Sequence, residues 1–230
     1  MLAAAILAAG ESTRMGEPKA LVSVQGLTFV EHLFTATRLP RVGLTRIVLG
    51  AHAAEIGPKL KFDPAMVVFN PDWTTGQLSS IHAAIRSLPI EATDGIILCP
   101  VDHPLVSRRL ISELIAQFDS TRKAIVLPLY RGKRGHPVIF RSTLYDELLA
   151  ASPEVGARQV VWAHPREIQE VPTEEEGVIL NLNDPETLKK AAHHLLRANS
   201  RVSLAFESPL PQFSRGPHST RPSQAQRRAS

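Results

Sequence analysis

Short, continuously apolar runs alternate with amphipathic stretches through the first half of the chain, and this alternation constrains the fold more than any other feature. The apolar runs predict strands over residues 3–7, 46–49, 66–69, 95–98 and 124–127. The amphipathic stretches predict helices over 28–39, 53–61, 78–88 and 107–118, the last with Ser107 as its N-cap. Strands that are apolar at every position are typical of parallel sheets covered by helices on both faces. The sequence therefore predicts an α/β fold.

The pattern is looser beyond about residue 128. Further strands are expected over 136–140, 167–172 and 177–183, and further helices over 142–150, 156–164 and 184–198. Pro185 lies near the first turn of the last helix, where a missing backbone N–H is tolerated. Residues 1–198 are therefore expected to form one domain.

Residues 199–230 differ in composition from the chain before them. They are rich in Pro, Ser and Arg and poor in apolar side chains, so we expect a disordered basic tail. From residue 201 onward five arginines stand against Glu207, a balance of +4 that equals the net charge of the whole chain. The first 200 residues therefore sum to zero, which argues against a nucleic-acid-binding surface on the domain.

The cysteine content and the apolar runs indicate the environment of the protein. Cys99 is the single cysteine, which excludes a disulfide framework. No apolar run reaches the roughly eighteen residues of a membrane-spanning helix. The apolar start, MLAAAILAAG, lacks the positive region of a leader and is interpreted as a buried strand. We therefore expect a cytoplasmic protein without membrane contact.

A loop with two cations directly follows the first predicted strand, in the stretch ILAAGESTRMGEPKAL. Such a loop lies at the carboxyl edge of a parallel sheet, where α/β folds bind ligands. Gly10 and Gly16 allow tight turns, Arg14 and Lys19 carry positive charge, and Ser12 adds a hydroxyl donor. The glycine spacing matches neither the P-loop nor the dinucleotide fingerprint. The loop is typical of a polyphosphate site; the alternative is a surface turn with solvated Arg14 and Lys19.

This loop resembles the signature of the MobA-like nucleotidyltransferases, which are related to molybdenum cofactor synthesis. The resemblance covers roughly residues 2–197 and continues through TTGQLSSIHAAI, CPVDHPLV, GHPVIF, GARQVV and NLNDPETL. Ala9 and the pair Pro18-Lys19 are similar to the cytidylyl-transferring members, because guanylyl-transferring members usually carry LAGG and DK there. The resemblance implies a three-layer α/β/α Rossmann-like domain with a mixed, mainly parallel sheet, of the nucleotide-diphospho-sugar transferase type.

Asp102 is the candidate metal ligand. It follows a predicted buried strand, and a carboxylate at that edge can hold Mg²⁺ against a triphosphate, although a turn or capping role is the alternative. The resemblance implies the same metal role for Asp102 and aligns Asn183 with the second metal ligand. Asp184 could take that place by a small shift, but it also lies where the last helix needs an N-cap.

The resemblance also implies the remaining site residues. Arg14, Lys19 and Asp102 are the expected catalytic residues. Nucleotide binding is expected at Leu7, Ala8, Ala9, Gly10, Ser12, Arg14, Lys19, Gly76 and Ser79. Acceptor binding is expected at Gln77, Ser80 and His136. From the residues alone, Ser79 or Ser80 could merely cap a helix, and the basic turn over 131–134 could be solvated.

The resemblance implies a Mg²⁺-dependent nucleotidyltransferase that moves CMP from CTP to the terminal phosphate of molybdopterin and releases pyrophosphate. A molybdenum hydroxylase is the partner that such a product implies; neither nucleic acid nor a membrane is expected. Two alternatives stay open: another nucleoside triphosphate with another small phosphate acceptor, such as a sugar or polyol phosphate, or a cofactor-binding chaperone without catalysis.

Overall fold

A mixed sheet forms the centre of the protein, whose computed structural model describes residues 1–191. The strand order is β10-β7-β9-β6-β1-β4-β5, with β8 paired to β7. Strand pairs β1–β4, β1–β6, β4–β5 and β7–β10 are parallel, whereas β9 runs antiparallel to β6 and β7. The strands are β1 (Leu2–Ala8), β4 (Val42–Leu49), β5 (Val67–Phe69), β6 (Gly95–Pro100), β7 (Ile125–Tyr130), β8 (Lys133–Arg134), β9 (Val138–Arg141) and β10 (Ile168–Pro172), besides the hairpin β2 (Ser23–Val24) and β3 (Leu27–Thr28).

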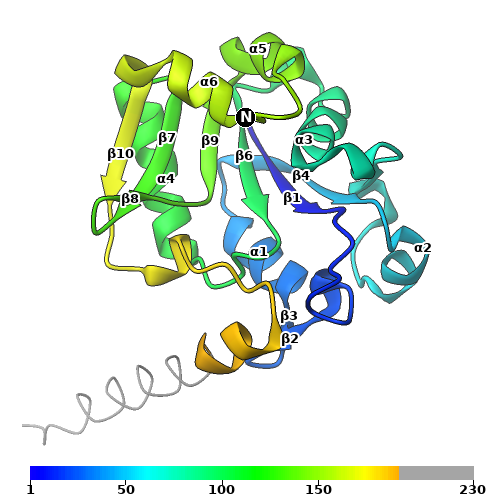
Figure 1. The fold of residues 1–230 in the computed structure, drawn as a ribbon. Helices are drawn as coiled ribbons and strands as arrows, with labels where there is room; N and C mark the ends of the chain where they lie inside the picture. Colours follow the sequence, from blue (N-terminus) through cyan, green and yellow to red (C-terminus); the bar gives the residue numbers. More distant parts are fainter. Residues whose placement is uncertain (192–230) are drawn as a thin grey trace, which may run out of the picture. The chain divides into compact units, whose positions relative to one another are not determined.

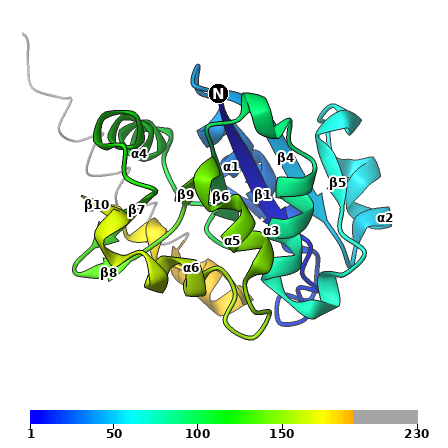
Figure 2. The same ribbon diagram turned by 90° about the horizontal axis from the view of Figure 1, so that it is seen from above.

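Helices cover both faces of this sheet, as the apolar strands predict. All seven residues of β1 are buried, and alternate side chains of β1 pack against the two helical layers. The helices are α1 (Phe29–Thr37), α2 (Ala53–Ile56), α3 (Gln77–Arg86), α4 (Arg108–Thr121), α5 (Tyr145–Ala150) and α6 (Arg158–Ala163). Figure 2 shows α1 and α4 on one face, with α3, α5 and α6 on the other. The predicted three-layer α/β/α fold with a mainly parallel sheet is confirmed.

Local capping signals place two of the helices. Thr28 and Glu31 form a capping box at the start of α1, with the Glu31 amide donating to Thr28 Oγ1 at 3.3 Å. Ser107 caps α4, because its Oγ accepts from the Leu110 amide at 3.1 Å. The predicted N-cap at Ser107 is therefore confirmed.

The predicted strand over 177–183 is wrong. This segment contains the short 3-10 helix Glu176–Val178 and then irregular chain. Two of its four apolar residues, Val178 and Leu182, are nevertheless fully buried. Burial without a neighbouring strand explains the error, because a short apolar run indicates burial more strongly than it indicates strand pairing. We call residues 173–183 the strap.

The predicted helix over 53–61 is shorter than expected. The α-helix ends at Ile56, and a 3-10 turn over Gly57–Lys59 follows with Pro58 in its first turn. The last predicted helix is present over 185–191, and the remainder of its predicted range lies outside the described residues. The predicted tail over 199–230 also lies outside them. Within residues 1–191 no helix is long and apolar enough to cross a membrane.

The carboxyl ends of β1 and β6 point toward the same edge of the sheet. In Figure 1 the loop after β1, the strap and the last described helix, coloured orange, gather at this edge. The strands thus bring together segments from the start, middle and end of the described chain, as the topology of α/β sheets favours for a ligand site.

Candidate active site

Left-handed backbone conformations, a hydrogen bond within the loop and one buried side chain determine the conformation of the loop after β1. Ser12 has a φ of 58° and Gly16 a φ of 80°, both in the left-handed region. Ser12 Oγ accepts from the Lys19 amide at 3.0 Å, which closes the loop. Met15 is only 7% exposed and ties the loop to the protein interior. The loop therefore presents the Lys19 side chain to the carboxyl edge of the sheet.

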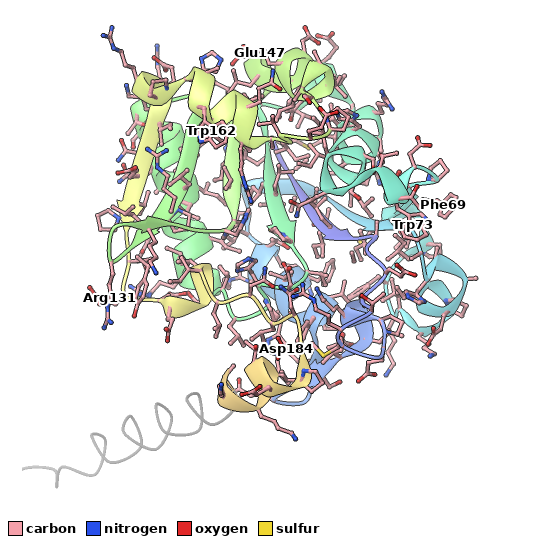
Figure 3. All side chains as sticks on the ribbon, viewed as in Figure 1. Phe69, Trp73, Arg131, Glu147, Trp162 and Asp184 are labelled. Carbon is pink, nitrogen blue, oxygen red and sulfur yellow. The ribbon has the colours of Figure 1, made fainter. Side chains whose placement is uncertain are left out.

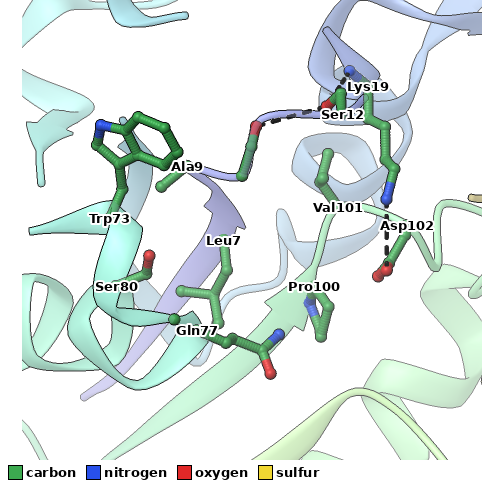
Figure 4. A pocket seen from close by; sticks show the side chains of 12 residues that line it. Leu7, Ala9, Ser12, Lys19, Trp73, Gln77, Ser80, Pro100, Val101 and Asp102 are labelled. Atoms are coloured by element: carbon green, nitrogen blue, oxygen red, sulfur yellow. Dashed lines mark hydrogen bonds and ion pairs between the residues drawn. The ribbon is translucent and has the colours of Figure 1, made fainter. Parts of the chain in front are cut away.

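The Lys19 ammonium lies between Asp102 and Asn183. Lys19 Nζ is 3.9 Å from Asp102 Oδ2 and donates a hydrogen bond to Asn183 Oδ1. The pair is half-buried, with 16% of the Lys19 side chain and 21% of the Asp102 side chain exposed. Burial lowers the pKa of Lys19, the Asp102 charge opposes that shift, and the charge of Arg14 adds to it. Figure 4 shows Lys19 directed at Asp102 across the mouth of a cavity.

The backbone around Asp102 is fixed on both sides. Just before it, the Val101 amide donates to the Leu7 carbonyl at 3.1 Å, which extends the β1–β6 pairing. The Asp102 carbonyl accepts from the Leu182 amide of the strap at 2.8 Å. The strap thus binds beside Asp102, and the next residue, Asn183, contacts Lys19.

Asp102 and Asn183 supply the kind of donors that Mg²⁺ prefers. One carboxylate and one amide oxygen approach the same ammonium. Mg²⁺ is usually held by one or two protein oxygens together with substrate phosphates and water. Within residues 1–191, no group of three or more His, Cys, Asp or Glu side chains could hold a metal by itself. Two protein oxygens, from Asp102 and Asn183, therefore fit a metal ion whose remaining ligands come from the phosphates of a nucleotide and from water.

Asp184 has a different task from Asn183. Its Oδ1 accepts from the Thr187 amide at 2.8 Å and from Thr187 Oγ1 at 2.9 Å, which makes it the N-cap of the helix over 185–191. These hydrogen bonds lower the pKa of the Asp184 carboxyl. Figure 3 shows Asp184 at the start of this helix. The geometry therefore favours Asn183 as the residue that faces Asp102 and Lys19.

A cavity of about 210 Å³ opens beside this cluster. Its walls come from three separate segments: the end of β1 with its loop, the start of α3, and the end of β6. The lining residues are Leu7, Ala9, Gly10, Ser12, Lys19, Trp73, Gly76, Gln77, Ser80, Pro100, Val101 and Asp102. Nine of the residues expected from the sequence are therefore brought to one cavity.

Four of the other expected residues lie elsewhere. Ala8 is buried in β1, on the strand face opposite to Leu7. Arg14 is exposed and outside the lining, although its charge lowers the pKa of both Lys19 and Asp184. Ser79 turns away toward Asn70, whose Nδ2 donates to Ser79 Oγ at 2.8 Å. His136 lines a second cavity.

Trp73 and Asn70 are parts of the site that sequence reasoning missed. Trp73 lines the first cavity near Ala9 (Figure 4). Gly50 permits this contact, since a Cβ there would lie 2.6 Å from the Ala9 carbonyl and 2.6 Å from Trp73 Cβ. Asn70 is 1% exposed and donates to both Ser79 and Ser80, so it orients the start of α3. The available signals were a glycine after the β4 run and the stretch NPDW before α3.

The second cavity, of about 450 Å³, adjoins the first and shares Leu7, Gln77 and Pro100 with it. Its lining combines apolar side chains with polar ones, of which Glu154 is acidic; the apolar side chains include Leu78, Ile81, Leu98, Leu127, Val138 and Phe140. Arg134 and Arg158 bring positive charge, and Trp162 lines it with 65% of its surface exposed. Figure 3 shows Trp162 on α6, whereas Arg131 projects outward at the tip of the β7–β8 hairpin. This cavity can take a ligand with an apolar part and a negative charge.

His136 in this cavity is an uncharged group at neutral pH. Burial lowers the pKa of His136 to about 4, and the neighbouring His103 adds to this shift. The two imidazole rings lie 4.9 Å apart. Within the described residues, His136 Nδ1 is buried and has no hydrogen-bond partner. A ligand in the second cavity could supply that partner.

Protonation of His136 should make stability depend on pH. Because the pKa is about 4 in the folded protein and 6.5 for an unperturbed histidine, the unfolded state binds more protons between these values. The contribution is complete above pH 6.5 and is lost as the pH falls toward 4, by roughly 2 to 3 kcal/mol. Urea unfolding from pH 7 to 4.5 should show a shallower decline for His136→Gln than for the wild type. Equal slopes in the two proteins would contradict this prediction.

Comparison with known proteins identifies relatives of this arrangement. Residues 4–168 match the family model of the MobA-like NTP transferase domain. The chain is 29% identical over 160 residues to nicotine blue oxidoreductase of Paenarthrobacter nicotinovorans, covering 66% of this chain and 78% of that protein. It is 30% identical over 135 residues to a probable molybdenum cofactor guanylyltransferase of Bacillus cytotoxicus, covering 58% of this chain and 64% of that protein.

A solved structure shares the fold. The Mycobacterium tuberculosis protein Rv0371C, in complex with manganese, superposes with a TM-score of 0.69 at 22% identity. The superposition covers 84% of this chain and 98% of that chain. The similarity extends over the sheet and its helices and demonstrates a common architecture.

Proposed function

The chain belongs to the MobA-like NTP transferase family, and from this premise we propose that it transfers CMP from CTP to the terminal phosphate of a molybdopterin-type acceptor. Pyrophosphate is the second product. One observation carries the proposal: the Lys19 ammonium, the Asp102 carboxylate and the Asn183 amide meet at the mouth of the cavity formed after β1. A cation beside two metal-binding oxygens suits a triphosphate with its magnesium ion.

The residues of the loop take the triphosphate. Lys19 neutralises charge that develops on the leaving pyrophosphate, and Arg14, an exposed residue of the same loop, adds a second cation. Asp102 and Asn183 would hold Mg²⁺, which when bound neutralises phosphate charge and orients the phosphates. The manganese complex of the Mycobacterium tuberculosis protein supports a divalent metal in this fold.

The reaction is an in-line displacement. An oxygen of the acceptor phosphate forms a bond to the α-phosphorus of CTP, and the bond from that phosphorus to the bridging oxygen breaks. The electron pair leaves with pyrophosphate. An ionised phosphate nucleophile needs no general base, so positioning and charge neutralisation supply the catalysis.

The second cavity supports an acceptor that has a flat ring system and a phosphate. It adjoins the first cavity through Leu7, Gln77 and Pro100, so a ligand there could bring its phosphate toward the nucleotide. Its aliphatic and aromatic side chains can pack against a flat ring, and its polar side chains, Arg134, His136 and Arg158, can bind the polar edge and the phosphate of a molybdopterin-type acceptor. A molybdenum hydroxylase would then receive the product.

The choice of nucleobase is tested by ligand-induced stabilisation. With Mg²⁺ present, CTP is expected to raise the melting temperature more than ATP, GTP or UTP. At a concentration 100 times the dissociation constant the gain is about 2.7 kcal/mol, or roughly 5 to 10 °C for a domain of this size. A larger shift with GTP would overturn the cytidylyl assignment, in line with the name of the Bacillus relative.

Catalysis is separated from mere binding by measuring pyrophosphate. The protein is incubated with Mg²⁺, CTP and molybdopterin, and release above that of the acceptor-free sample is expected. A carrier without activity would bind both ligands and release none. Pyrophosphate is the deciding readout because one relative is named as an oxidoreductase, and that chemistry would not produce it.

A further inference from the structure

The strap over 173–183 is attached to the sheet at several separate points. At its start, the Thr173 amide donates to the Leu129 carbonyl at 3.0 Å. The Glu175 carboxylate then accepts from the Ser107 amide at 3.1 Å and from Ser107 Oγ at 2.5 Å. The first of these bonds goes to a residue of β7 and the others go to the N-cap of α4, so the course of the strap depends on its individual contacts.

Two glycines permit the closest of these contacts. A Cβ on Gly135 would lie 2.5 Å from the Val178 carbonyl oxygen, and a Cβ on Gly177 would lie 2.8 Å from the Leu105 carbonyl oxygen. Neither glycine has a positive φ, so close approach, rather than backbone conformation, requires the missing side chain. The His136 amide donates to the same Val178 carbonyl at 2.8 Å. An alanine at either position would push the strap away from the chain that it packs against, because the added Cβ would overlap with a carbonyl group.

The end of the strap is the part that reaches the candidate active site. The Leu182 amide bonds to the Asp102 carbonyl, and Asn183 contacts the Lys19 ammonium. We infer that Gly135 and Gly177 are positioning residues, which seat the strap deeply enough for Asn183 to meet Lys19 and Asp102. This inference rests on the proposed function, since it assigns the two glycines an effect on binding of the magnesium–nucleotide complex.

Seating of the strap can be measured without any ligand. Hydrogen exchange of the peptide containing Leu182 should be about tenfold faster in Gly135→Ala and in Gly177→Ala than in the wild type. Gly95→Ala is a control with a comparable clash, because its Cβ would lie 2.6 Å from the Phe140 carbonyl, away from the strap. Gly57→Ala is a control without a clash, as nothing lies within 4 Å of that Cβ. Both controls should leave exchange of the Leu182 peptide unchanged.

A double-mutant cycle tests whether the glycines act through Asn183. Affinity for CTP with Mg²⁺ is measured by calorimetry for Gly135→Ala, Asn183→Ala and the double variant. Each single variant is expected to lose about tenfold in affinity. If Gly135 acts through Asn183, the double variant should lose no more affinity than either single variant does. Gly95→Ala combined with Asn183→Ala should lose only what Asn183→Ala loses. Gly177→Ala replaces Gly135→Ala in the cycle if the latter does not fold.

The outcomes separate this inference from the proposed function. Unchanged exchange of the Leu182 peptide in both glycine variants, or losses that multiply in the double variant, would overturn the positioning role. If the wild type binds CTP but releases no pyrophosphate with the acceptor, the proposed catalysis fails and the exchange result still stands. Faster exchange together with non-multiplying losses supports the positioning role.

Discussion

Replacing Asp102 with alanine is expected to reduce pyrophosphate release by about 1,000-fold or more, while the protein stays folded. Among residues 1–191, Asp102 is the one carboxylate that pairs with Lys19, and its side chain is 21% exposed at the cavity mouth. Its removal takes away the anionic metal ligand and leaves Lys19 with only the neutral Asn183 oxygen. The rate is measured by coupled detection of pyrophosphate at saturating Mg²⁺.

Charge and shape at position 102 can be separated. Asp102→Asn keeps the size of the side chain and loses the charge, so it should be nearly as inactive as Asp102→Ala. Asp119→Ala is the matched control, because Asp119 is an exposed aspartate that pairs with Arg41 on the surface. That variant should keep full turnover. Turnover by Asp102→Ala within tenfold of the wild type, with an unchanged melting temperature, would refute the metal assignment.

Replacing Lys19 with alanine is expected to lower kcat/KM by roughly 100- to 1,000-fold through loss of the charge that faces the triphosphate. Lys19→Arg should not restore the rate, because the compact ammonium fits between Asp102 and Asn183 where a planar guanidinium would not. Lys59→Ala is the matched control, since Lys59 is exposed and pairs with Glu55 of the neighbouring helix α2, away from the candidate site. Equal steady-state rates for Lys19→Ala and Lys59→Ala would exclude the loop as the triphosphate site.

The lowered pKa of Lys19 adds a pH dependence to this prediction. Burial favours the neutral amine, so in the free enzyme the charge is lost at a lower pH than for an ordinary lysine. The protonated form is the active one, and kcat/KM should therefore decline on the alkaline side below pH 10.5, the value for an unperturbed lysine. The decline should be absent from the residual activity of Lys19→Ala. A decline of the same shape in both proteins would assign it to another group.

Much of the central fold could be predicted because its signals are local. The apolar runs that became β1, β4, β5, β6 and β7 were recognisable, since a strand buried on both faces needs apolar residues at consecutive positions. The cap at Ser107 was equally local, because a capping side chain lies within three residues of the amide that it binds. The strap was mistaken for a strand because its buried residues, Val178 and Leu182, carry the same apolar signal.

In the candidate site, too, the features with a local sequence signal were predicted and those that depend on distant contacts were not. The loop chemistry of Gly10, Ser12 and Lys19 was visible in one short stretch, and all three residues line the first cavity. The different positions of Ser79 and Ser80 were not visible: both were expected in the site, but adjacent helix residues point in different directions, and of the two only Ser80 lines the first cavity. Trp73 was missed because its position depends on the space left by Gly50, which is distant in the sequence and directly follows β4.

By itself, the amino-acid sequence determined the strands, the helix caps and the cationic loop after the first strand, because periodicity, capping and turn formation act over a few neighbouring residues. Only the tertiary structure decided that Asn183 meets Lys19, from which it is separated by 164 positions, whereas the cap that Asp184 forms with Thr187 is local. The physical reason is that this meeting depends on how deeply the strap packs between distant loops. That depth is set by the space at Gly135 and Gly177, and no local pattern around Asn183 records it.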